Sequence, residues 1–158
     1  MSTLCQKMSR METCLPCSSL AEKKWTPSTY YGVDIDCMAK PRERLNEYIK
    51  IAADEAKKSP MSQKHGCVVI HKNKVVATGY NKQVEPLSLT SIHAEVNALM
   101  KAKKILNRSE LKQSKLMVVR IGTNSMDNPL KYSKPCKVCQ NFIEKLGVQL
   151  VYYSTSNA

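Results

Sequence analysis

Two short motifs, far apart in the chain, constrain its fold more than any other feature. His93-Ala94-Glu95 and Pro135-Cys136-Lys137-Val138-Cys139 each stand at the start of an expected helix. Cys136 and Cys139 are three residues apart, so a helix presents both thiols on one face. If the imidazole of His93 joins them, the fold has to bring two separate helix starts together.

Two thiolates and one imidazole are a ligand set that zinc prefers, so we expect His93, Cys136 and Cys139 to bind Zn²⁺. The helix N-terminus is electropositive, which lowers the pKa of a thiol and favours the thiolate. Three protein ligands leave a fourth position open for water. This open position distinguishes a catalytic zinc site from a structural one.

Glu95 lies two residues from His93, so it does not share the direction of the ligand but reaches the water beside the metal. A carboxylate there takes the proton of the water and passes it to a departing amine. His-x-Glu followed by Pro-Cys-x-x-Cys is the pattern of zinc-dependent nucleobase deaminases. A Cys-x-x-Cys pair alone is also found in structural zinc sites and redox sites, but those readings leave Glu95 without a role.

The order of the expected elements predicts an α/β fold. Apolar residues recur at helical steps over 41–58, and short β-branched runs separated by Lys72-Asn73-Lys74 predict a hairpin. Strand–helix–strand units predict parallel pairing with helices on both faces of a sheet of about four strands. The expected elements are a helix at 41–58, strands at 67–70 and 75–78, a helix at 93–106, a strand at 116–121, a helix at 136–146 and a strand at 148–153.

The first 40 residues differ from the rest of the chain. Residues 1–40 hold Cys5, Cys14, Cys17 and Cys37 without sustained periodicity, so we expect a loosely ordered arm before a zinc-dependent domain at 41–158. Cys14 and Cys17, together with Cys5 and Cys37, are candidates for a second zinc site, and lone thiols are the alternative. The arm holds five basic and four acidic residues, so nearly all of the net charge of +12 lies on 41–158. This surplus favours a nucleotide or nucleic-acid partner.

The composition also bears on the compartment. No apolar run approaches the roughly 18 residues of a membrane helix, and no secretory signal is recognisable, so we expect no membrane association and an intracellular protein, cytoplasmic or nuclear. Seven cysteines in a reducing compartment are thiols or metal ligands rather than disulfides.

Residues 60–153 resemble the cytidine deaminase-like superfamily, most closely its deoxycytidylate deaminase branch. The resemblance rests on Gly79-Tyr80-Asn81, on the run from His93 to Ala98 and on Pro135–Cys139. It implies a three-layer α/β/α sandwich, with Zn²⁺ held by His93, Cys136 and Cys139 and with Glu95 as the proton shuttle. It also implies substrate contacts, made by the Asn81 side chain, the Ala94 backbone, Ser133 and Pro135.

The chain departs from this family at its C-terminal end. The family continues past the last strand with another helix and strand, whereas this chain ends at Ala158, so the fold is expected to be C-terminally short. The C-terminal wall of the pocket is then missing, or it is supplied by the N-terminal arm or by another subunit. An uncovered edge strand also predicts a homo- or hetero-oligomer.

The sequence leaves three functions open. The first is a hydrolytic deaminase that converts cytosine to uracil in a free cytidine or deoxycytidine nucleotide. The second is a deaminase of a base within RNA or DNA, either cytosine to uracil or adenine to inosine in tRNA. The third is a catalytically idle, zinc-stabilised nucleic-acid-binding subunit. Lys131, Lys134 and Lys137 surround the cysteine motif and are candidates for phosphate contacts, and His65 is a candidate to face the site.

Overall fold

The fold is known from a computed structural model, which describes residues 28–33, 43–85, 89–122 and 130–155. The expected second zinc site at Cys14 and Cys17 lies outside these residues. Within them, the model contains no helix long and apolar enough to cross a membrane.

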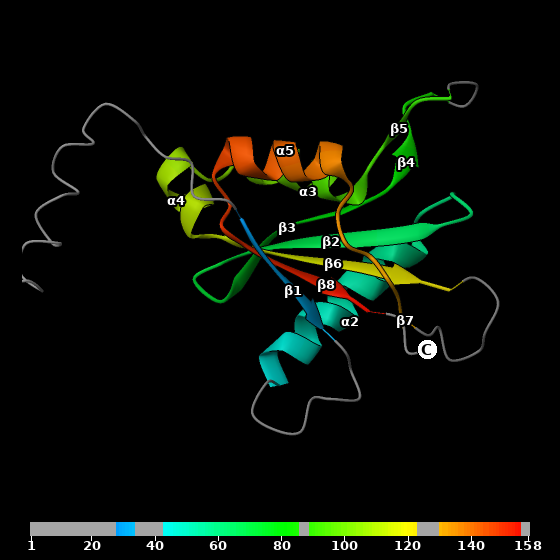
Figure 1. Ribbon diagram of the computed structural model, residues 1–158, viewed down its shortest axis with the longest axis horizontal. Coiled ribbons are helices and arrows are strands. Elements are labelled where there is room, and N and C mark those ends of the chain that lie inside the picture. The colour runs from blue at the N-terminus through cyan, green and yellow to red at the C-terminus, as the bar shows by residue number, and fades with distance from the viewer. Residues whose placement is uncertain (1–27, 34–42, 86–88, 123–129, 156–158) are drawn as a thin grey trace, which may run out of the picture.

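A six-stranded mixed sheet forms the centre of the structure (Figure 1). Its main path runs β1-β8-β6-β2-β3, with β7 paired to β6, and β4 and β5 form a separate ribbon. Strands β1, β8 and β6 are parallel, whereas β2 is antiparallel to both β6 and β3. The elements in order are β1 (Thr29–Val33), α2 (Glu43–Lys57), β2 (Lys64–His71), β3 (Lys74–Tyr80), β4 (Lys82–Gln83), β5 (Ser91–Ile92), α3 (Ala94–Ala102), α4 (Arg108–Gln113), β6 (Lys115–Ile121), β7 (Leu130–Lys131), α5 (Lys137–Leu146) and β8 (Leu150–Ser154).

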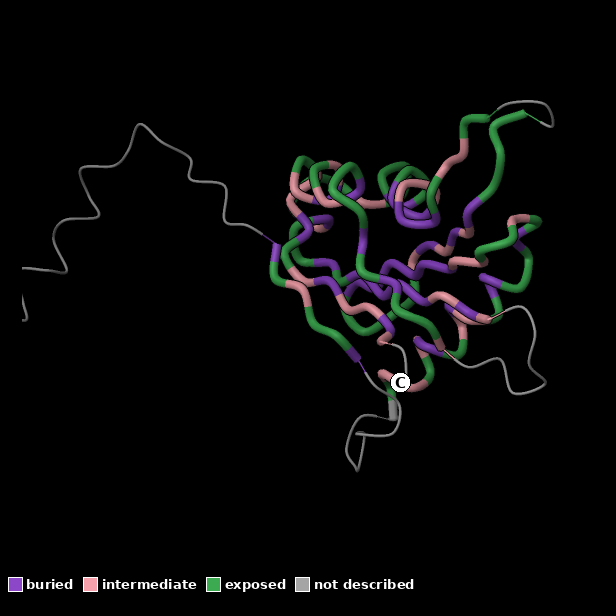
Figure 2. Tube along the Cα trace, turned by 45° about the vertical axis from the view of Figure 1, so that its right-hand side comes forward, coloured by how far each residue is buried: buried purple, intermediate pink, exposed green. Residues whose placement is uncertain are grey.

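Helices cover both faces of the sheet, so the predicted three-layer α/β/α arrangement is confirmed. On one face α2 packs over a cluster of strand residues that includes Val68 and Met117. On the other face α3, α4 and α5 pack over a cluster that includes Cys67 and Val118 (Figure 1). Buried residues follow the strands between these layers, whereas the ribbon of β4 and β5 projects with mostly exposed residues (Figure 2).

The helices and strands expected over 41–154 are present, with differences at their ends. The predicted hairpin is confirmed as β2 and β3, joined by Lys72 and Asn73, which both have positive φ. The helix expected over 93–106 is shorter, because α3 ends at Ala102. A separate helix, α4, which was not expected, follows it, and its start is capped reciprocally by Asn107 and Glu110. The additional strands β1 and β7 raise the number in the sheet above the expected four.

The expectation of a loosely ordered arm is wrong for Thr29–Val33. These residues form β1, which pairs in parallel with β8 from Thr29↔Leu150 to Val33↔Ser154. Ser28 anchors the start of the strand, because its hydroxyl donates to the carbonyl of Val148 at 2.6 Å. The segment before residue 41 therefore supplies a strand at the edge that the C-terminally short chain was expected to leave open. The division into an arm and a domain remains a prediction for residues 1–27.

An oligomer was predicted from an uncovered edge beside β8. That edge is paired with β1, which is itself the last strand of the described sheet, so the uncovered edge lies at β1 instead of β8. Oligomerisation stays a prediction.

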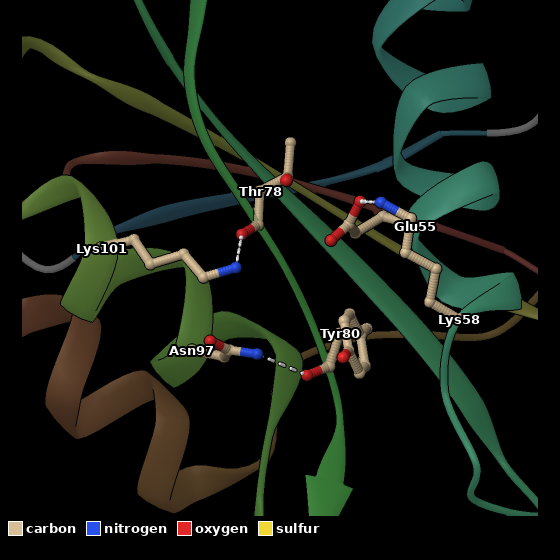
Figure 3. A network of polar contacts seen from close by, with 6 residues as sticks. All are labelled: Glu55, Lys58, Thr78, Tyr80, Asn97 and Lys101. Atoms are coloured by element: carbon tan, nitrogen blue, oxygen red, sulfur yellow. Dashed lines mark hydrogen bonds and ion pairs between the residues drawn. The ribbon is translucent and has the colours of Figure 1, made fainter.

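Helix α3 approaches β3 so closely that no side chain fits between them at Gly79. A Cβ added there would lie 2.5 Å from the backbone nitrogen of Ala98 and 2.8 Å from the carbonyl oxygen of Ala94. Two side chains of α3 reinforce the contact (Figure 3). Asn97 donates to the carbonyl of Tyr80 and Lys101 to that of Thr78, both at 2.8 Å. These contacts fix where α3 begins.

We expect Gly79→Ala to lower the free energy of unfolding by about 1–3 kcal/mol, because the new methyl group forces α3 away from β3. Urea denaturation followed by far-UV circular dichroism measures the change. Gly32→Ala is the control, since its Cβ would meet the side-chain methyl of Thr155 at 2.9 Å, which can rotate away. Equal losses in the two variants would contradict the packing argument.

Candidate metal centre and cavity

His93 and Cys136 occupy equivalent positions, each immediately before the first residue of a helix. His93 precedes α3 with φ −72° and ψ 156°, and Cys136 precedes α5 with φ −68° and ψ 167°. The backbone carbonyl of each accepts the first helical hydrogen bond, from Asn97 at 3.0 Å and from Gln140 at 2.9 Å. Because the two helices pack side by side on one face of the sheet, their first residues meet (Figure 1).

The ligand atoms of His93, Cys136 and Cys139 all lie within 4.8 Å of one another. The Nδ1 atom of His93 is 3.2 Å from the Sγ atom of Cys139 and 3.6 Å from that of Cys136. Tetrahedral zinc bonded to a nitrogen at about 2.0 Å and a sulfur at about 2.3 Å separates the two atoms by about 3.5 Å. The donor set and its spacing therefore fit one zinc ion.

The electrostatics of Cys139 differ from the expectation that the helix N-terminus favours a thiolate. Burial raises the pKa of the Cys139 thiol well above its ordinary value, and the charges of Glu95 and Cys136 raise it further. Desolvation of a buried thiol therefore outweighs the helix dipole at this position. A divalent cation between the thiols offsets this cost, because a coordinating thiol is deprotonated by the metal.

Glu95 lies in the first turn of α3 beside this group. Its side chain is buried, with 5% of the residue exposed, and it lines a cavity of about 370 Å³. Burial raises the pKa of Glu95, while a hydrogen bond to its own backbone and the charge of His93 oppose the shift. A buried carboxylate of raised pKa next to a metal group is suited to accept and return a proton.

The cavity brings together residues from six parts of the chain. It is partly open to solvent and has His93, Cys136 and Glu95 in its wall. The remaining lining comes from the segment before β2, from the ends of β2 and β3, from β5 and from the segment before α5. The lining residues are Met61, Ser62, Gln63, His65, Asn81, Ser91, His93, Ala94, Glu95, Ser133, Lys134 and Cys136.

Three of the four expected substrate residues line this cavity, namely Asn81, Ala94 and Ser133, whereas Pro135 does not. The amide of Asn81 also holds the cavity wall, because its Oδ1 accepts from the backbone of His65 at 2.8 Å and its Nδ2 donates to the carbonyl of Gln63 at 2.7 Å.

The hydroxyl of Ser133 is likewise occupied, since it donates to the carbonyl of Val118 at 2.8 Å and accepts from the backbone of Ser154 at 2.9 Å. The side chains of Asn81 and Ser133 thus shape the wall through contacts with the chain itself. Pro135 lies beside the cavity, and its carbonyl accepts from the side chain of Gln140 at 2.8 Å.

Two candidates from the sequence, His65 and Lys134, also face the cavity. Burial lowers the pKa of His65, and the nearby charges of Arg120 and His93 lower it further, so its imidazole is neutral at neutral pH. The wall formed by residues 61–63 was not expected from the sequence. No local pattern marks these residues, because the contact that holds Gln63 in the wall is made by Asn81, 18 positions away.

A known zinc-binding family matches the part of the chain that contains this site. Residues 42–155 match the family model described as the cytidine and deoxycytidylate deaminase zinc-binding region. No curated protein matched the chain.

Among solved structures, the chain is similar to the dCMP deaminase of the cyanophage S-TIM5 in complex with dCMP and dUMP, at 24% identity over 74% of this chain and 85% of that one, with a TM-score of 0.51. The apo form of the same protein matches at 26% identity over 75% and 88%, with a TM-score of 0.49. Cytidine deaminase from Burkholderia pseudomallei matches at 24% identity over 65% and 76%, with a TM-score of 0.48.

We expect Cys136→Ser to weaken zinc binding by more than about 100-fold, because loss of a ligand costs more than loss of an outer partner. The protein is also expected to be less stable, since metal binding is coupled to folding. Elemental analysis of the purified protein measures bound zinc. Cys67→Ala is the matched control, because Cys67 is a buried free cysteine outside the metal group. Full zinc content in Cys136→Ser would refute the ligand assignment.

Proposed function

The chain belongs to the cytidine and deoxycytidylate deaminase family, and we propose that it converts cytosine to uracil in a free cytidine or deoxycytidine nucleotide. As a member it is a zinc-dependent hydrolase that acts on nucleobase amines. The observation that carries the substrate assignment is the cavity of about 370 Å³ with Glu95 and Lys134 among its lining residues. Its volume is in the range of small-ligand sites.

The residues of the cavity have different roles in the proposed reaction. Zinc, held by His93, Cys136 and Cys139, supplies Lewis-acid chemistry that makes a water molecule a nucleophile near neutral pH. Glu95 accepts the proton of that water and delivers it to the leaving amine. Water adds at the carbon that bears the amine, the carbon–nitrogen bond breaks, and ammonia leaves. The burial of Glu95 excludes bulk water from these proton transfers.

The residues that line the cavity around Glu95 are suited to bind a planar base joined to a sugar. The backbone of Ala94 lies at the start of α3 between His93 and Glu95, where it can contact the edge of a base. The neutral His65 and the second hydrogen of the Asn81 amide offer polar contacts without adding charge. Lys134 offers a cation to an anionic group of the substrate.

A base within a polynucleotide is the second candidate, and the positive charge around the cavity favours it. Arg120 and Lys131 are paired residues on β6 and β7, close to the segment that carries Lys134. Among the described residues, none of these three cations forms an ion pair. A phosphate backbone is a possible partner for such a surface. The third reading, an idle zinc-stabilised subunit, does not agree with membership of an enzyme family or with the position of Glu95.

We expect Glu95→Gln to lower the rate of ammonia release by about 10²- to 10⁴-fold while zinc content is retained, because only proton transfer is lost. A coupled assay for ammonia measures the rate. Glu55→Gln is the control, since Glu55 is a buried acid on the opposite face of the sheet, paired with Lys58. Unchanged turnover in Glu95→Gln would exclude the proposed mechanism.

We expect zinc-loaded protein to release ammonia from CMP or dCMP in preference to single-stranded DNA or tRNA, because the cavity accommodates one nucleotide. The substrates are assayed in parallel at several salt concentrations. Turnover on a polymer alone, falling steeply as salt rises, would establish the second candidate instead.

A further inference from the structure

Tyr30 reaches the catalytic face of the sheet from β1, outside the residues 42–155 that match the family. Its ring packs against the core cluster beneath α3 and α5, and its hydroxyl is buried. Tyr31, the next residue, points to the opposite face, where its ring lies 5.8 Å from that of Tyr152. The alternation along β1 therefore assigns one tyrosine to each face.

The ring of Tyr30 lies below Lys134, whose ammonium is 6.0 Å from the ring centroid. This distance is at the limit for attraction between a cation and an aromatic face. The neighbours of Lys134 are buried, and the backbone N–H of Ser133 donates to the carbonyl of Ser154 at 2.9 Å. The backbone of Lys134 is thus held in place while its side chain is exposed and lines the cavity.

The electrostatic surroundings of Tyr30, on β1, include charged groups of α5 and of the metal group. Burial raises the pKa of its phenol, and the charges of Glu144, Cys139 and Glu95 contribute to the shift. The phenol is therefore within electrostatic range of α5 and of the catalytic carboxylate. In the described part of the chain, Lys134 has no acidic partner, so its ammonium is available to a ligand.

We propose that Tyr30 is a positioning residue that holds the ammonium of Lys134 over the cavity, where it binds a phosphate of the substrate. Strand β1 then determines the preference for a phosphorylated nucleotide over an unphosphorylated nucleoside. This inference rests on the proposed function for the identity of the base. It adds a role for a segment that the family match does not include.

The test compares kcat/KM for dCMP and deoxycytidine in the wild type, Tyr30→Leu, Lys134→Met and the double variant. We expect Lys134→Met to lose about tenfold or more with dCMP, as loss of a hydrogen bond to a charged group does. Tyr30→Leu should lose about two- to fivefold with dCMP. Neither variant should change kcat/KM for deoxycytidine, and Tyr30→Leu should add nothing to Lys134→Met.

Controls separate positioning from a general loss of structure. Tyr30→Phe keeps the ring and should keep the preference for dCMP, and Tyr31→Leu alters the same strand on the other face and should keep it too. Tyr30→Met, which keeps much of the bulk, replaces Tyr30→Leu if that variant does not fold. Equal losses with dCMP and deoxycytidine, or additive losses in the double variant, would overturn the proposal.

A binding measurement keeps this inference distinct from the proposed function. If the wild type deaminates neither of these compounds nor CMP, the proposed function fails. Calorimetric titration with dUMP and deoxyuridine then tests Tyr30 and Lys134 without turnover. We expect the wild type to bind dUMP more tightly and both variants to lose that difference. Equal affinity of the wild type for the two ligands would refute the role of Tyr30.

Discussion

The contact between α3 and β3 is the constraint on which the site depends. With no side chain at Gly79, the helix backbone lies directly on the strand, and Asn97 and Lys101 tie it to strand carbonyls. This contact places His93 and Glu95 at the end of α3 that meets the start of α5. Because protein interiors are close-packed, there is no room for even a methyl group at Gly79 without a shift of the helix that carries Glu95.

Burial of the metal-binding site changes how readily its side chains carry charge. Burial raises the pKa of Cys139 and that of Glu95, so desolvation shifts both side chains toward their neutral forms when no cation is near. A zinc ion between the thiols reverses this preference for Cys139 and leaves Glu95 beside a strong positive charge. Desolvation of these side chains therefore destabilises the site when the metal is absent. When the metal is bound, it leaves Glu95 suited to proton transfer.

Strand β1 links the part of the chain outside the family match to the catalytic face. It covers the edge of β8, contributes Val33 to the core on one face, and places Tyr30 on the other. Strand pairing alone would stabilise the edge. Because the ring of Tyr30 lies beneath the ammonium of Lys134, the proposed role of Tyr30 gives the same strand an influence on what the cavity binds.

The sequence by itself determined the metal-binding motifs, the hairpin, the three-layer class and the end of α5 at Leu146, because each depends on residues close together in the chain, on the order of the elements or on a specific ligand set. Only the tertiary structure decided that Thr29–Val33 is a strand, that residues 61–63 form a wall, and that Asn81 holds that wall. Ser28 bonds a residue 120 positions away, and local periodicity carries no signal for such pairing. The partners that make β1 a strand become neighbours only after the sheet has formed.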